Sequence, residues 1–168
     1  MKYLIIVIIS ISSFILFYKG LKNDPNIVPS NLISKKVPAF TLDVLEGDPF
    51  TNHDLSYDNI KVVNFFASWC PPCKIEHEQL INLSKKHDVF GIAKKDTMEN
   101  VKLWLQDRGN PYNKIGFDFD GLASIEWGVY GLPETFIVNK SGEIIYRHVG
   151  PITSDNINKI QSIIKSSL

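Results

Sequence analysis

Cysteine is scarce in this chain, which has two cysteines among 168 residues. Two cysteines cannot build a zinc site from two cysteine pairs. An excess of charge is missing as well, because 18 Lys and Arg residues balance 18 Asp and Glu residues. No overall field would attract nucleic acid or an anionic surface, so nucleic acid is not expected as a partner. Low-complexity tracts and internal repeats are also absent, and the length suits one domain with a real core.

One long apolar run contrasts with this balanced composition. It extends from Tyr3 to Tyr18, is interrupted only by three serines, and has Lys2 before it and Lys19 after it. As a helix it would reach about 24 Å, which interfacial tyrosines and local bilayer thinning could match to a hydrocarbon core of ~30 Å. No small-residue cleavage site follows, so we expect residues 1–19 to form a membrane anchor, with a cleaved signal peptide as the alternative. The flanking lysines do not decide its orientation.

The rest of the chain divides into a short tether and one patterned region. Residues 20–37 carry two prolines, three asparagines and no apolar period, which is typical of a linker. Over residues 38–168, short β-rich runs alternate with runs of helical period. We expect strands over residues 38–45, 61–67, 89–93, 135–139 and 143–149, and helices over residues 71–86, 99–108 and 156–165. This order predicts an α/β domain with a mixed central sheet and helices on both faces.

The apolar stripes of two expected helices indicate which sides they bury. The stripes comprise Ile75, Leu80, Ile81 and Leu83 in the helix over residues 71–86, and Val101, Leu103, Trp104 and Leu105 in the helix over residues 99–108. His77 and His148, in contrast, are expected at the surface.

The two cysteines lie where a buried strand gives way to a helix, in the segment Trp69-Cys70-Pro71-Pro72-Cys73. Unpaired N–H groups and the positive end of the helix dipole favour a thiolate there, and the thiolate is the nucleophile in disulfide exchange. Cys70 at the helix end is therefore expected to attack a partner disulfide. Cys73, one turn deeper, is placed to resolve the mixed disulfide and release the product.

Other roles for the cysteine pair stay open. A structural disulfide here would close a loop of only four residues, worth about 2 kcal/mol. A metallochaperone could bind copper or zinc through Cys70 and Cys73, although no histidine shows paired ligand spacing. Covalent haem attachment is excluded, because it requires a histidine where Lys74 stands.

Four segments together resemble the thioredoxin superfamily and, more narrowly, the thiol:disulfide interchange proteins of cytochrome c maturation (the DsbE/CcmG group). They are residues 64–77, which contain the cysteines, residues 104–112, residues 128–136 (GVYGLPETF) and residues 146–150. The resemblance covers about residues 38–151. It implies a thioredoxin-like three-layer fold, preceded here by the expected N-terminal membrane anchor.

The resemblance also implies roles for individual residues near the cysteines. Cys70 would be the attacking thiolate and Cys73 the resolving thiol. Pro133 would be a cis-proline facing the disulfide, with Leu132 before it and Trp69 beside the nucleophile lining a substrate groove. Asn64, which stands where cytoplasmic thioredoxins have a buried aspartate, agrees with a role outside the cytoplasm.

Two acidic residues are further candidates for the catalytic site. Glu76 follows Cys73 by three residues, so both lie on one face of the expected helix. Glu76 is either a poorly solvated carboxylate that exchanges protons with Cys73 or a solvated glutamate in the first turn. Glu134, directly after Pro133, either belongs to the site, as the resemblance implies, or is a surface charge on an edge strand.

The function that follows is that of an extracytoplasmic thiol–disulfide oxidoreductase. By resemblance its substrates would be apocytochrome c or a chaperone that holds the apocytochrome thiols, and a transmembrane thiol carrier would supply electrons. The anchor would lie in the inner membrane with the domain facing the periplasm. No cofactor and no metal are implied. A general disulfide oxidant or isomerase and the metallochaperone are the alternatives.

Overall fold

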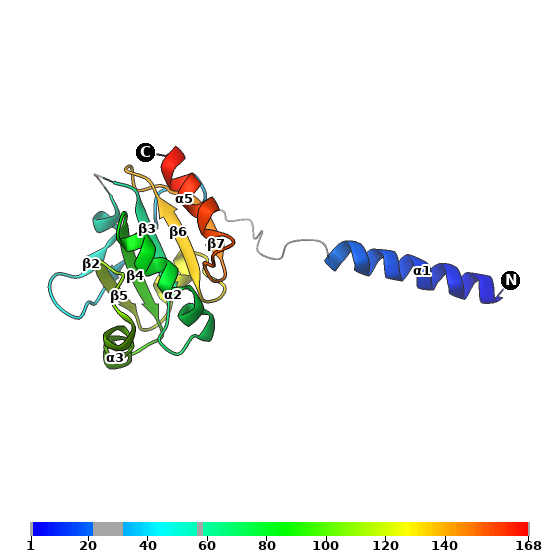
Figure 1. Cartoon of the computed structure of the whole chain (residues 1–168), viewed down its shortest axis with the longest axis horizontal. Coiled ribbons are helices and arrows are strands. Elements are labelled where there is room, and N and C mark those ends of the chain that lie inside the picture. Colours follow the sequence, from blue (N-terminus) through cyan, green and yellow to red (C-terminus); the bar gives the residue numbers. More distant parts are fainter. Residues whose placement is uncertain (1, 22–31, 57–58, 168) are drawn as a thin grey trace.

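The computed structural model describes residues 2–21, 32–56 and 59–167. The first element, α1 (Lys2–Leu21), is a helix of 20 residues, drawn in blue in Figure 1. Its window Tyr3–Gly20 has a mean hydropathy of 2.0, and every side chain in that window is exposed. The helix is therefore long and apolar enough to cross a membrane, and it buries no apolar face against protein.

A five-stranded sheet forms the centre of the domain, in the order β5-β4-β3-β6-β7 (Figure 1). Strand β3 pairs in parallel with β4 and antiparallel with β6, so the sheet is mixed, as predicted. The strands are β3 (Lys61–Phe66), β4 (Asp88–Lys94), β5 (Lys114–Asp118), β6 (Glu134–Val138) and β7 (Ile144–Val149).

Helices cover both faces of this sheet, which confirms the predicted three-layer class. The alternation of β3 residues divides the core: Val62 and Phe66 belong to one cluster, Val63 and Phe65 to the other. The first cluster contains residues of α2 (Pro71–Ser84), α3 (Met98–Arg108) and α5 (Ile157–Ser166). The second contains Ala123 of α4 (Leu122–Glu126) and the hairpin of β1 (Thr41–Leu42) and β2 (Phe50–Thr51), which the short helix η1 (Asn52–Leu55) follows.

Three predicted features of this architecture need correction. The strand expected over residues 38–45 shrinks to the two residues of β1, and both β5 and α4 were missed. Strand β5 carries Gly116, where a Cβ atom would come within 2.8 Å of Leu42 and Phe50, so tertiary packing requires a residue of poor strand propensity. Helix α4 has five residues, too few to show a helical period.

The packed domain begins earlier than residue 38. The Ser34 amide donates to the Ile144 carbonyl at 2.8 Å, and the Val37 amide donates to the Gly142 carbonyl at 2.9 Å. The last residues of the expected linker are thus tied to the start of β7. Residues 22–31, the main part of that linker, lie outside the described residues.

The buried side of α2 differs from the apolar stripe predicted for it. Ile75 is 65% exposed, whereas Glu76 and His77 are buried in line with Cys73, Leu80 and Leu83. His77 is buried because its Nε2 lies 3.0 Å from the Gly109 carbonyl oxygen, beyond the end of α3, and because its ring packs on Trp104.

Two further residues differ from their predicted exposure. His148, expected at the surface, is half-buried, and Leu103, expected in the α3 stripe, is exposed. Trp104 is a core residue, as predicted.

Candidate active site

The two cysteines are joined in a disulfide at the point where β3 leads into α2. Cys70 is the N-cap of α2, and its Sγ accepts a hydrogen bond from the Cys73 amide at 3.3 Å. Pro71 opens the helix, where the N–H group that proline lacks would have had no intrahelical partner. The Cys73 amide is therefore directed at the Cys70 sulfur, and together with the positive end of the helix dipole it stabilises negative charge there.

A groove of about 300 Å³ lies beside Cys70. Both cysteines are nearly buried, with 3% of Cys70 and 1% of Cys73 exposed, but only Cys70 lines the groove. Among the predicted site residues, Trp69 and Leu132 also line it, and the Leu132–Pro133 peptide bond is cis, as expected. The full lining is Trp69, Cys70, Pro71, Pro72, Lys94, Lys95, Tyr130, Gly131 and Leu132.

Lys94, Lys95 and Tyr130 are groove residues that sequence reasoning did not select. Lys94 ends β4, which runs parallel to β3, and the carboxyl ends of parallel strands meet at one edge of a sheet. That rule could have placed the two lysines beside the cysteines. Tyr130 belongs to the segment of residues 128–136 that carries the family resemblance, and that segment could have indicated it.

The turn after β4 holds the segment that precedes the disulfide. The indole Nε1 of Trp69 donates to the Lys95 carbonyl at 3.1 Å, and the Ser68 amide donates to the Asp96 carboxylate at 2.6 Å. Trp69 is 58% exposed, so its ring stands at the groove edge and is not a core tryptophan. Cys70 is thereby flanked by a fixed aromatic surface.

Glu76 is fully buried, which rules out the solvated first-turn alternative. The Asn64 side-chain amide donates to its Oε1 at 2.8 Å, and the Ile152 backbone amide donates to its Oε2 at 3.0 Å. Burial raises the pKa of Glu76 to about 8, although both hydrogen bonds act in the opposite direction. The carboxyl group can therefore take up or release a proton near neutral pH.

Glu134 is also fully buried, so it is not a surface charge on an edge strand. Its Oε2 receives a bond of 2.7 Å from both Nε and Nη2 of Arg147. Its Oε1 accepts from the amides of Tyr130 at 2.8 Å and Gly131 at 3.2 Å. The Glu134 carboxylate thus holds the loop that forms one wall of the groove.

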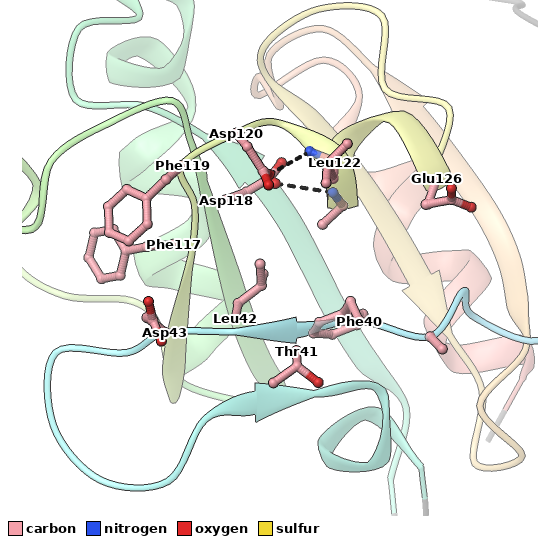
Figure 2. Close-up of a pocket in the computed structure, with 12 residues that line it drawn as sticks. Phe40, Thr41, Leu42, Asp43, Phe117, Asp118, Phe119, Asp120, Leu122 and Glu126 are labelled. Atoms are coloured by element: carbon pink, nitrogen blue, oxygen red, sulfur yellow. Dashed lines mark hydrogen bonds between the residues drawn. The ribbon is translucent and has the colours of Figure 1, made fainter.

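A second hollow of about 300 Å³ lies between β1 and the turn from β5 into α4 (Figure 2). It contains no predicted site residue. Asp118 and Asp120 line this hollow, and both accept hydrogen bonds from backbone amides in the first turn of α4. The Leu122 amide donates to the Asp120 carboxylate at 2.9 Å. These carboxylates stabilise the positive end of a short helix.

The fold and this site define a class of protein: a thioredoxin-fold oxidoreductase with one redox-active cysteine pair. In keeping with the fold, the chain superimposes on an interchange protein DsbE of Chlorobium tepidum with a TM-score of 0.67 at 21% identity, over 81% of this chain and 98% of that one. A thioredoxin of Neisseria meningitidis matches with a TM-score of 0.67 at 26% identity, over 79% and 91% of the two chains.

Sequence comparison then places the chain in a family. The model of the Redoxin family matches residues 33–164. The thiol:disulfide interchange protein HelX of Rhodobacter capsulatus is 43% identical over 140 residues, which cover 82% of this chain and 80% of HelX. DsbE of Escherichia coli is 39% identical over 133 residues, which cover 77% and 72%. The chain belongs to the Redoxin family, among the thiol:disulfide interchange proteins of the DsbE and HelX type, and it is a thiol–disulfide oxidoreductase.

Proposed function

We propose that this protein reduces disulfides in other proteins outside the cytoplasm, with Cys70 as the attacking thiolate and Cys73 as the resolving thiol. The observation that carries this assignment is the asymmetry of the pair: Cys70 lines the groove, whereas Cys73 does not. A partner seated in the groove can reach the Cys70 sulfur. Cys73 can then reach only the Cys70 side of a mixed disulfide.

The reaction proceeds in two exchanges. The Cys70 thiolate attacks one sulfur of the partner disulfide, a mixed disulfide forms, and the other partner sulfur leaves as a thiolate and takes up a proton. The Cys73 thiolate then attacks the Cys70 sulfur, which forms the Cys70–Cys73 disulfide and releases the second partner thiolate. Two electrons pass to the partner, and a donor dithiol must return them before the next cycle.

Glu76 is assigned the proton transfer at Cys73. Cys73 has to lose its proton before it can resolve the mixed disulfide, and Glu76 lies one helical turn along the same buried face. A carboxyl group whose pKa is raised to about 8 can accept a thiol proton near neutral pH. Trp69 and Leu132 would contact the partner chain, Pro133 would face it beside the disulfide, and Glu134 would keep their loop in place.

The proposed substrates are apocytochrome c or the chaperone that holds its haem-attachment thiols. Support comes from the resemblance of residues 64–77 and 128–136 to the cytochrome c maturation group and from relatives named as interchange proteins. Reducing power would come from a transmembrane thiol carrier, since a compartment that favours disulfides has no soluble reductant pool.

The proposed location is the inner membrane, with α1 as a single-pass anchor and the domain in the periplasm. We expect the full-length chain, including residues 1–19, to remain with membranes after a carbonate or high-salt wash, because α1 is exposed and apolar along its length. Immunoblotting of the washed fractions and N-terminal sequencing measure this. A soluble mature form that begins after residue 20 would contradict it.

The reduction potential of the Cys70–Cys73 couple tests the direction of electron flow. A reductant is expected to lie well below about −200 mV, whereas a general oxidant lies near about −120 mV. The potential is measured by equilibration with glutathione or dithiothreitol buffers, with quantification of both redox forms. A value in the oxidant range would overturn the proposal. Copper or zinc retained in stoichiometric amount after purification under reducing conditions would favour the metallochaperone instead.

A further inference from the structure

Glu76 is the end of a buried chain of hydrogen bonds that begins at Tyr112. The Tyr112 hydroxyl donates to Asn64 Oδ1 at 2.9 Å, and Asn64 Nδ2 donates to Glu76 Oε1 at 2.8 Å and to Thr135 Oγ1 at 3.1 Å. Tyr112 is 6% exposed, and Asn64 and Glu76 are fully buried. Water therefore does not replace any of these partners at low cost.

These hydrogen bonds define which side of the Asn64 amide faces Glu76. A side-chain amide has an acceptor oxygen on one side and donor N–H groups on the other, and either side can face a neighbour. With its oxygen on Tyr112, Asn64 presents N–H to Glu76, which stabilises the carboxylate. If the amide turned over, two oxygens would face each other, and Glu76 would have to keep its proton to bridge them.

The position of Tyr112 is built into the core. Its ring stacks on Phe66 with centroids 4.7 Å apart. A Cβ atom at Gly91, which pairs with Asn64 across β3 and β4, would come within 3.0 Å of the Tyr112 ring, so glycine leaves the space that the ring occupies. Burial and then the charge of Glu76 raise the pKa of Tyr112 well above its usual value. The phenol thus keeps its proton at working pH, and it can donate to Asn64.

We propose that Tyr112 is a positioning residue for disulfide exchange: its hydroxyl donates to Asn64 Oδ1 and so supports the amide orientation in which Asn64 offers N–H to the Glu76 carboxylate. The hydroxyl also polarises the amide, which strengthens the bond that Asn64 donates. Both effects favour the ionised form of Glu76. The inference rests on the proposed role of Glu76 as the proton acceptor for Cys73.

Within residues 32–56 and 59–167, few other titratable groups lie near Glu76. On its own helix the neighbour is Cys73, which titrates only when the disulfide is reduced. His77 turns to Gly109 and Trp104 instead. On β7, His148 is the register partner of Thr135 and lies on the same side of the sheet, where its ring contacts Asn156. Glu134 and its partner Arg147 lie on the opposite side, since adjacent residues of β6 alternate.

The test is Tyr112→Phe in the oxidised full-length protein in detergent, where no cysteine titrates. We expect the Glu76 carboxyl to lose its proton at a pH higher by up to about one unit, because Asn64, which donates to the carboxylate, loses the hydrogen bond that the Tyr112 hydroxyl gives to its Oδ1. Nuclear magnetic resonance of isotope-labelled glutamate side chains follows the titration. Tyr146→Phe, which removes a hydroxyl from β7 beside Lys159, is the matched control and should leave the titration unchanged.

A second measurement uses the reduced protein. Tyr112→Phe should move alkylation of Cys73 to lower pH, because Glu76 then stays neutral over a wider range, and in a Glu76→Gln background it should have no further effect. An unchanged Glu76 titration in the oxidised protein would overturn the positioning role. An equal shift of Cys73 with and without Glu76 would overturn it as well, because Tyr112 would then act through packing alone. A shifted Glu76 titration together with an unchanged Cys73 alkylation profile would support the hydrogen-bond role of Tyr112. It would overturn the proposed role of Glu76 in the exchange reaction.

Discussion

Cys73→Ser is expected to convert the protein into a covalent trap for its partners. Cys70 still lines the groove and attacks a partner disulfide, but nothing resolves the mixed disulfide that forms. Turnover of a protein disulfide should fall on the order of a thousandfold or more, as it does when an essential nucleophile is removed. Adducts should accumulate on non-reducing gels and disappear when dithiothreitol is added.

Cys70→Ser provides the contrast. The remaining Cys73 does not line the groove, so it should trap little or nothing although the same number of thiols is present. Mass spectrometry of the adducts identifies the partners and shows whether they carry haem-attachment cysteines. The double serine variant controls for non-covalent association. Equal trapping by the two single variants would mean that the cysteines have no fixed order.

Glu76→Gln is expected to change the pH dependence of both stability and thiol chemistry. In the oxidised protein the pKa of Glu76 is raised from 4.5 to about 8, because burial disfavours its charged form. Below pH 4.5 the carboxyl is protonated in the folded and the unfolded chain, and it contributes no pH dependence. Between pH 4.5 and about 8 only the unfolded chain releases the proton, so stability falls as pH rises, and above about 8 the loss is complete.

The wild-type protein should therefore lose on the order of 3–5 kcal/mol of unfolding free energy relative to Glu76→Gln between pH 4.5 and 9. The comparison across pH is needed because glutamine replaces one acceptor oxygen by an N–H group, which has a cost that does not depend on pH. Denaturant unfolding of the oxidised form at several pH values measures the difference. Glu78→Gln, an exposed position on the same helix, is the control and should show none of it.

The reduced protein gives the functional side of the same prediction. A negative charge at Glu76 disfavours a second one at Cys73, and the two groups should titrate as a coupled pair. Without the carboxylate, Cys73 should be alkylated at lower pH, while Cys70 changes less. Single-cysteine variants with and without glutamine at position 76 separate the two thiols. An unchanged Cys73 profile would show that Glu76, although buried, is not coupled to the reaction.

Local patterns were sufficient for the chemistry and for most of the sheet. The segment of residues 69–73 places two thiols at the start of a helix. This placement could be predicted because the residues that determine it are adjacent in the sequence. Strands β3, β4, β6 and β7 are apolar and β-rich, so their positions were predicted within a few residues. The polar residues of α2 were harder to place. The sequence predicted His77 at the surface and left Glu76 open, because their burial depends on hydrogen-bond partners in other segments.

The fold class, the reactive cysteine pair and the apolar N-terminal helix could be predicted from the amino-acid sequence, because each depends on composition or on spacings of a few residues. Three features needed the folded chain: which cysteine lines the groove, the ion pair of Glu134 with Arg147, and the link from Glu76 through Asn64 to Tyr112. The hydrogen bonds around Glu76 join four separate segments, which carry Asn64, Glu76, Tyr112 and Ile152. These bonds form only after β3 and α2 have packed together with the loops that carry Tyr112 and Ile152. Burial in that packed core, and not any local pattern, raises the pKa of Glu76 into the range where it can exchange a proton with a thiol.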